Sequence, residues 1–140
     1  MEIKKCTSDN DIAKCWQVIV ELRPHLIESE FINTVKEMVS EGYQLAFIEE
    51  DGKAAAAIGY RYLQYLYNGK HIYIDDLSTL PAARGKGYGG KLLDFVEAEA
   101  KAKGYKVVTL DSGHQRFDAH RLYLNKGFKI VAHHFSKTLS

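Results

Sequence analysis

The glycine-rich segment from Arg84 to Gly90 is the feature that most restricts what this chain can fold into. It holds four glycines in six residues, and it joins an apolar stretch typical of a strand to a long amphipathic helix. Glycine lets the backbone approach a ligand closely, and the first N–H groups of a helix have no partner within the helix. Because these donors lie at the positive end of the helix dipole, the pattern predicts an anion-binding turn suited to a pyrophosphate.

The spacing of apolar residues along the rest of the chain predicts the element order βααβββαβαβ. We expect strands over 2–6, 44–48, 54–66, 71–79, 106–110 and 128–136. We expect helices from the capping pair Ser8-Asp9 to Pro24, and over 28–41, 88–103 and 116–126. Consecutive hairpins and a single βαβ crossover imply an α/β (α+β) fold, with a mixed, mostly antiparallel central sheet flanked by helices.

Each of the first three helices shows an apolar face at helical spacing, and these faces predict the core. The inward residues are Ile12, Trp16, Ile19 and Val20 in the first helix, Phe31, Val35, Met38 and Val39 in the second, and Leu92, Leu93, Val96 and Ala100 in the third. Gly42 and Gly104 follow the second and third helices, where a left-handed residue commonly ends a helix.

Length and composition predict a single domain over residues 1–140, because 140 residues with 46% apolar and 26% charged side chains match an ordinary globular protein. A formal charge of +1 gives no strong positive field, so nucleic acid is not an expected partner. We expect no membrane segment or signal peptide, and therefore a cytoplasmic protein. Cys6 and Cys15 lack a CxxC spacing, which favours buried thiols in a reducing cytosol over a zinc site.

The glycine-rich turn has two alternative interpretations. Gly85, Gly87 and Gly90 spell the GxGxxG of dinucleotide-binding folds, and Asp111 follows the next strand as a ribose-binding acid would. Only about 50 residues follow the turn, however, and such a fold needs several more parallel βαβ units. The second alternative is a helix cap whose basic residues face water, but that role does not need so many glycines.

Two motifs resemble those of the GCN5-related N-acetyltransferase (GNAT) family. The family's coenzyme A loop, R/Q-x-x-G-x-G/A, is matched by Arg84, Gly87 and Gly89. Its second signature, A-x-x-x-Y-x-x-x-G-F, is matched by the run from Ala119 to Phe128. Element order and length fit as well, so the resemblance covers essentially the whole chain. Within the family, the run from Arg116 to Phe128 most resembles the aminoalkylphosphonate N-acetyltransferase branch.

The resemblance implies the GNAT acyl-CoA N-acyltransferase fold and acetyl-CoA as the cosubstrate. In the family a bulge before the loop frees backbone N–H groups that bind the thioester and pantetheine. The residues implied to bind the cofactor are Leu77, Ser78, Thr79, Arg84, Gly85, Lys86, Gly87, Tyr88, Gly89, Gly90 and Arg116. The chain departs from the family pattern where Ser78 and Thr79 replace an aliphatic pair, and where Arg116 replaces an asparagine common in other members.

Tyr123 and Asp76 are the expected catalytic residues. Tyr123 matches the signature tyrosine, which in many members gives a proton or hydrogen bond to the departing sulfur; an aromatic packed in the core is the alternative. Asp75 and Asp76 interrupt an apolar strand, and only one of them can face a cleft because successive strand residues point to opposite faces. We prefer Asp76 as the base, since acids just before the cofactor strand serve that role in relatives. The alternative is that both are solvated or paired.

Histidines and tyrosines recur along the chain without a clear ligand set. His114, His120, His133 and His134 do not have a metal-ligand spacing, so no metal is expected. The tyrosines of the third strand could line a substrate cleft, lie on the sheet surface or form a homodimer contact; they are Tyr60, Tyr62, Tyr65 and Tyr67.

The sequence therefore predicts an enzyme, an acetyl-CoA-dependent N-acetyltransferase. It would transfer an acetyl group to a primary amine of a small molecule by direct attack in a ternary complex, without a cysteine intermediate. A non-catalytic acyl-CoA-binding module and a protein N-acetyltransferase are the alternative hypotheses.

Overall fold

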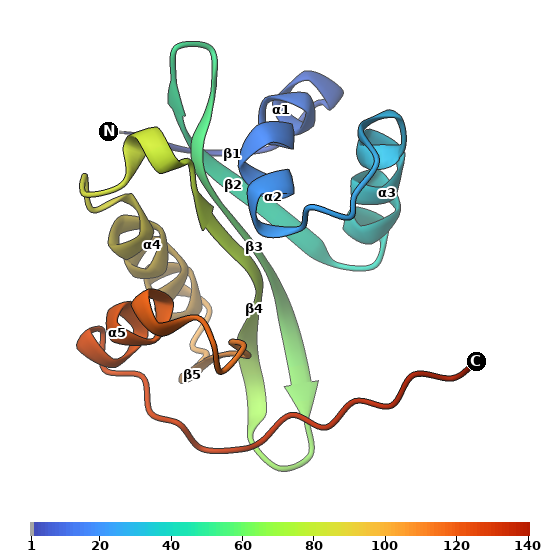
Figure 1. The fold of residues 1–140 in the computed structure, drawn as a ribbon. Coiled ribbons are helices and arrows are strands. Elements are labelled where there is room, and N and C mark those ends of the chain that lie inside the picture. The colour runs from blue at the N-terminus through green and yellow to red at the C-terminus, as the bar shows by residue number, and fades with distance from the viewer. Residues whose placement is uncertain (1) are drawn as a thin grey trace. The chain divides into compact units, whose positions relative to one another are not determined.

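The computed structural model describes residues 2–140, which form two compact units that divide after Leu110 (Figure 1). The first unit holds all five strands and most of the helices. Its elements in chain order are β1 (Ile3–Lys5), α1 (Asp9–Lys14), α2 (Trp16–Leu22), α3 (Glu28–Ser40), β2 (Tyr43–Glu50), β3 (Lys53–Tyr65), β4 (Gly69–Thr79), a 3-10 turn η1 (Pro81–Ala83), α4 (Tyr88–Ala102) and β5 (Val107–Leu110). The single-domain assignment stays a prediction.

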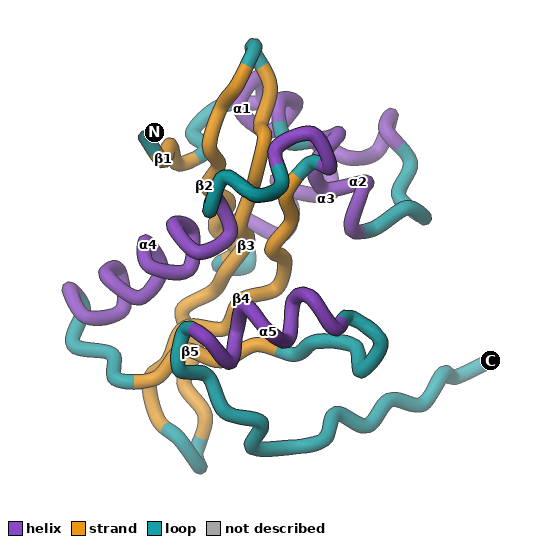
Figure 2. The backbone as a smooth tube through the Cα atoms, turned by 60° about the vertical axis from the view of Figure 1, so that its left-hand side comes forward, coloured by secondary structure: helices purple, strands orange, loops and turns teal. Residues whose placement is uncertain are grey.

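The five strands form one sheet in the order β1-β2-β3-β4-β5. The first four are antiparallel neighbours, and β5 is parallel to β4 because the chain returns through α4. Helices α2 and α3 pack on the sheet, and α4 covers the opposite face, as Figures 1 and 2 both show. The predicted mixed sheet flanked by helices is confirmed.

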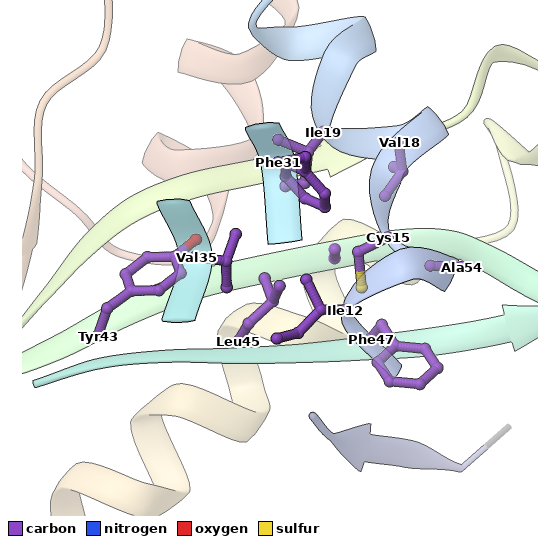
Figure 3. Close-up of a cluster of buried hydrophobic side chains, with 11 residues drawn as sticks. Ile12, Cys15, Val18, Ile19, Phe31, Val35, Tyr43, Leu45, Phe47 and Ala54 are labelled. Carbon is purple, nitrogen blue, oxygen red and sulfur yellow. The ribbon is translucent and has the colours of Figure 1, made fainter. Parts of the chain in front are cut away.

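A buried cluster fills the layer between the sheet and α1 to α3 (Figure 3). Phe31 and Val35 of α3 meet Leu45 and Phe47 of β2 there, and all four are at least nine-tenths buried. The Trp16 ring packs edge-on against Phe31 with the ring centroids 5.2 Å apart. Burial of these side chains holds the first three helices on one face of the sheet.

The helices follow the sequence prediction, with one difference in a boundary and two in the inward faces. Val20, predicted to face inward, is only half-buried, whereas Val18 is fully buried. The first helix is divided at Cys15, whose amide bonds to the Ile12 carbonyl three residues back and so tightens the turn. Val39, predicted to face inward, is 49% exposed because it lies in the last turn of α3, one residue before the helix ends. The inward residues of α4 are all buried, as predicted.

The second unit spans Asp111–Ser140 and contains one helix, α5 (Phe117–Asn125). The predicted strand over 128–136 is wrong: the structure assigns neither helix nor strand to residues 128–140. A strand requires a neighbour to bond its backbone groups, and an apolar pattern alone does not supply one. Across residues 2–140, no helix combines the length and apolarity that crossing a bilayer demands.

The β3–β4 pairing contains a bulge that positions the two acidic residues. Gly59 pairs with Asp76 and Tyr60 pairs with Ile74, which leaves Asp75 as the extra residue. Gly59 also has a packing role, because a Cβ at this position would collide with the Tyr43 phenol. The bulge and the tyrosine therefore depend on a residue with no side chain at position 59.

Replacing Gly59 by alanine should destabilise the protein by about 1–3 kcal/mol, because the methyl group overpacks against Tyr43. Denaturant titration measures the free energy of unfolding. The loss should shrink when the same change is made in a Tyr43→Ala background, which removes the ring. An equal loss in both backgrounds would contradict this packing argument.

Candidate active site

The glycine-rich turn has the geometry of an anion site. Gly85 has φ +86° and Gly87 has φ +79°, a left-handed region that residues with a Cβ rarely adopt. Gly87 is the N-cap of α4, and no side chain caps that helix end. The N–H groups of the first turn of this 15-residue helix are therefore oriented toward the space beside the loop, at the positive end of the helix dipole.

Charged side chains around the turn are held by carboxylates. The Lys86 Nζ lies 3.0 Å from a carboxylate oxygen of Glu50, and the Tyr88 hydroxyl donates to the same carboxylate. The hydrogen bond from Tyr88 has the largest effect on Glu50, followed by that from Lys86, and both lower the pKa of this carboxylate. The Arg84 guanidinium is exposed and lies 3.8 Å from Glu21. Both basic side chains thus remain beside the turn, where a negatively charged ligand would meet them.

The strand that leads into the turn has an open edge. In residues 2–140, β5 pairs with β4 only over His71–Ile74, so no strand pairs with 75–79 on that side. On the other side, Leu77, Ser78 and Thr79 keep their antiparallel pairing with β3. The bulge of β4 lies at Asp75, two residues ahead of Leu77, whereas the family resemblance implied one at Leu77 to Thr79. An open edge presents unpaired backbone N–H and C=O groups that an extended ligand can bind.

Asp76 lies where three elements meet, and its side chain is only 13% exposed. Its carboxylate accepts a hydrogen bond of 2.7 Å from the Tyr43 hydroxyl of β2 and one of 3.0 Å from Nε of Arg23, just after α2. A second nitrogen of Arg23 donates to the Asp75 carbonyl at 2.9 Å. The contacts connect the end of α2 and the start of β2 to the bulge of β4.

Asp75 has a separate partner. Its carboxylate accepts hydrogen bonds of 2.9 and 3.2 Å from Nε of Arg61. Burial raises the pKa of Asp75, although the Arg61 guanidinium opposes that shift. Burial, followed by the nearby Asp76 charge, raises the pKa of Tyr43 well above its usual value, so its hydroxyl stays protonated and can donate. Both aspartates are therefore paired, the arrangement that the sequence left as an alternative.

A cavity of about 230 Å³ lies against Asp76. Its walls come from the end of α2, the connection to α3, one face of α3 and the start of β2, with Asp76 as the contribution of β4. Asp75 is not among the lining residues. Of the two candidate bases, only Asp76 thus borders this cavity.

The second unit contains the other two expected site residues. Tyr123 lies within α5, its ring packs edge-on against Phe128 at 5.9 Å, and its carbonyl accepts from the Phe128 amide. Burial raises the pKa of Tyr123, and Arg116 opposes that shift, so the phenol is protonated at neutral pH. Arg116 is the N-cap residue of α5. The roles of Tyr123 and Arg116 stay predictions.

The environment of Cys15 disfavours a reactive thiolate. Cys15 is fully buried, and both thiols are free, with their sulfur atoms 3.9 Å apart. The hydrogen bond with Cys6 and then burial raise the pKa of Cys15, which disfavours the nucleophilic thiolate. Among the residues that the structure describes, no three His, Cys, Asp or Glu side chains gather as metal ligands would.

Three residues at the site were not identified from the sequence: Arg23, Tyr43 and Glu50. Arg23 precedes a proline at a helix end, and Glu50 precedes an Asp-Gly turn, positions at which charged residues are common. Tyr43 begins a strand, where an aromatic residue is ordinary. No local pattern separates these residues from surface or core positions.

Comparison with known proteins identifies the family. The model of the acetyltransferase (GNAT) family matches residues 10–128. This chain belongs to the GNAT acetyltransferase family. It is 34% identical over 139 residues to the uncharacterised N-acetyltransferase YhdJ of Bacillus subtilis, covering 98% of each chain. It is also 34% identical over 98 residues to the aminoalkylphosphonate N-acetyltransferase of Salmonella typhimurium, covering 69% of this chain and 62% of that protein.

Solved structures of acetyltransferases share the fold. An aminoglycoside N-acetyltransferase AAC(6')-Iy in complex with CoA has a TM-score of 0.84 at 13% identity, over 99% of this chain and 93% of that one. A glucosamine-6-phosphate N-acetyltransferase from Arabidopsis thaliana has a TM-score of 0.78 at 23% identity, over the full length of both chains. The GNAT fold is confirmed. The dinucleotide-binding interpretation of Gly85, Gly87 and Gly90 is excluded, because the sheet formed by residues 2–140 has a single pair of parallel strands.

The Tyr43→Phe variant should lose about 1–3 kcal/mol of stability, because the Asp76 carboxylate loses a 2.7 Å hydrogen bond in a partly buried position. Tyr60→Phe is the matched control: that hydroxyl is 3.4 Å from Glu99, a long hydrogen bond whose loss should cost less than about 1 kcal/mol. Urea unfolding of both variants measures the difference. A larger loss in Tyr60→Phe would contradict the role given to Tyr43.

Proposed function

We propose that this GNAT family member transfers an acetyl group from acetyl-CoA to a primary amine of a small molecule. The observation that carries the proposal is the continuity of the open edge of β4 with the anion-binding turn. One extended ligand with a pyrophosphate beyond its extended arm could lie along both, and the cavity borders Asp76 on the same strand. The CoA complex of the AAC(6')-Iy neighbour supports the same choice of ligand.

The residues present fit coenzyme A. A Cβ added at Gly85 or Gly87 would meet no atom within 4 Å, so these positions adjoin open space where a phosphate can approach the backbone. Backbone N–H groups at the start of α4, from Tyr88 to Gly90, would hold the pyrophosphate, with Arg84 and Lys86 adding positive charge. Leu77, Ser78 and Thr79 would pair with the pantetheine arm through the backbone. We assign Arg116 as a further cofactor contact.

Acetyl-CoA supplies a thioester whose carbonyl carbon accepts the amine and whose sulfur leaves. Asp76 takes up a proton from the substrate ammonium, directly or through a water, because attack requires the neutral amine. Backbone donors on the open edge of β4 polarise the carbonyl. Tyr123 gives its phenolic proton to the departing sulfur, and the raised pKa keeps that proton in place at neutral pH. The N–C bond would form and the C–S bond would break, and the second proton lost by the attacking nitrogen would restore the Tyr123 phenol through solvent.

Two features favour direct transfer to a small acceptor. Cys15 is buried and its pKa is raised, which argues against an acetyl-cysteine intermediate. The volume of about 230 Å³ suits a small molecule, whereas a peptide acceptor would need an extended groove. A non-catalytic binding module would retain the turn without turnover, and so the decisive test must include turnover.

Saturating acetyl-CoA should stabilise the protein by about 2.7 kcal/mol at 100 times its dissociation constant, whereas NAD should not. Gly87→Ala should diminish this stabilisation, because a methyl group at φ +79° strains the N-cap beside the expected pyrophosphate. Gly104→Ala is the matched control, with φ +75° just after the other end of α4. Thermal unfolding with and without each ligand measures both effects. Equal ligand stabilisation in the two variants would contradict the cofactor site.

The Tyr123→Phe variant should lower turnover at least tenfold, which corresponds to about 1.4 kcal/mol of transition-state stabilisation. Its stabilisation by acetyl-CoA should be nearly unchanged, because the hydroxyl acts on the sulfur only when the C–S bond breaks. Steady-state release of free thiol measures turnover. Wild-type turnover in this variant would exclude Tyr123 as the acid.

A further inference from the structure

The cavity beside Asp76 has walls that restrict the acceptor amine. Most of its lining is apolar and comes from both helices and the sheet: Ile19, Leu26, Phe31, Val35, Met38 and Leu45. The volume of the cavity is about 230 Å³. A cavity of this size and composition favours a compact apolar group over a highly hydrated one.

The charges of the lining favour a cation. The lining holds one arginine, Arg23, and two carboxylates, Asp76 and the exposed Glu30. The charge of Arg23 is already matched, because its guanidinium donates to the Asp76 carboxylate at 3.0 Å and to the Asp75 carbonyl at 2.9 Å. His25 and Thr34 complete the polar part of the lining. The lining therefore carries one more carboxylate than guanidinium, so a substrate ammonium would meet a net negative charge, and Asp76 lies on the strand proposed to hold the thioester.

The same lining disfavours an acceptor that carries an anionic group. A phosphonate or phosphate would give up its hydration among aliphatic and aromatic side chains, and it would have to compete with Asp76 for Arg23. Recognition of such groups in proteins relies on cations that are available for charge-assisted hydrogen bonds. In this cavity Nε and one terminal nitrogen of Arg23 already donate to the Asp76 carboxylate and the Asp75 carbonyl.

We propose that the acceptor is a primary amine attached to an uncharged, apolar body, of the arylalkylamine or alkylamine class, rather than an amine that carries a phosphonate or phosphate. This inference rests on the proposed acetyltransferase function and adds the class of its substrate. The proposed acceptor class differs from that of the aminoalkylphosphonate N-acetyltransferase of Salmonella typhimurium, which this chain matches over 62% of that protein's length.

The test compares phenethylamine with 2-aminoethylphosphonate as acceptors for the full-length protein, with thiol release from acetyl-CoA as the readout. We expect kcat/KM to be at least tenfold higher for phenethylamine. An equal or higher value for the phosphonate overturns the inference. In parallel, thermal unfolding in the presence of CoA reports the binding of each amine without requiring turnover.

A pair of charge variants tests whether this cavity is the acceptor site. Ile27 lines the cavity and is 57% exposed, so Ile27→Lys adds a positive charge at its wall without emptying the core. Val39→Lys is the control, since Val39 is 49% exposed on the helix that follows Ile27 and does not line the cavity. We expect Ile27→Lys to lower kcat/KM for phenethylamine at least fivefold and Val39→Lys to change it less than twofold. Equal effects overturn the assignment of the cavity.

The outcomes separate this inference from the proposed function. Binding of phenethylamine in preference to the phosphonate, with turnover of neither, supports the acceptor class and contradicts catalysis. Turnover with the phosphonate preferred supports catalysis and contradicts the acceptor class. If neither amine binds nor reacts while acetyl-CoA still stabilises the protein, the acceptor inference fails and the cofactor site stands.

Discussion

The site depends on the hydrogen bonds that the partly buried carboxylate of Asp76 accepts. This carboxylate receives the Tyr43 hydroxyl from β2 and the Arg23 guanidinium from the end of α2, and so it ties both elements to β4. A carboxylate this deeply placed is stable only with such partners, since an unpaired buried charge is costly. Tyr43 can reach it only because Gly59 has no side chain. The ion pair, the bulge and the wall of the cavity are thus one connected arrangement.

The two edges of β4 differ in their hydrogen bonding. One edge continues the antiparallel pairing with β3 as far as Thr79, which keeps the strand rigid. The other loses its partner after Ile74 and leaves backbone groups free up to the glycine-rich turn. Backbone donors are thereby available for the proposed cofactor, whereas Asp76 borders the cavity proposed for the acceptor. The two proposed functions therefore use different atoms of the same strand.

Local patterns predicted most of the elements correctly, and the exceptions have physical reasons. The faces of α3 and α4 follow from helical spacing, except that Val39 lies where the helix ends and is half exposed. The expected strand over 128–136 is absent because an apolar pattern indicates a tendency, and a strand forms only against a partner. Successive residues of a strand point to opposite faces, so the sequence predicted that only one of Asp75 and Asp76 faces a cleft. The structure places the bulge of the strand at Asp75.

By itself the sequence determined what depends on neighbours along the chain: the amphipathic helices, the hairpins, and the glycine turn that opens α4 with its basic residues and family motif. The tertiary structure alone decided which distant side chains meet. Arg23 reaches Asp76 across 53 positions, and Tyr43 reaches it across 33, with no local pattern to mark either residue. The reason is that local spacing limits backbone conformation, whereas the partners of a buried charge and the shape of a cavity are fixed only when separate elements pack together.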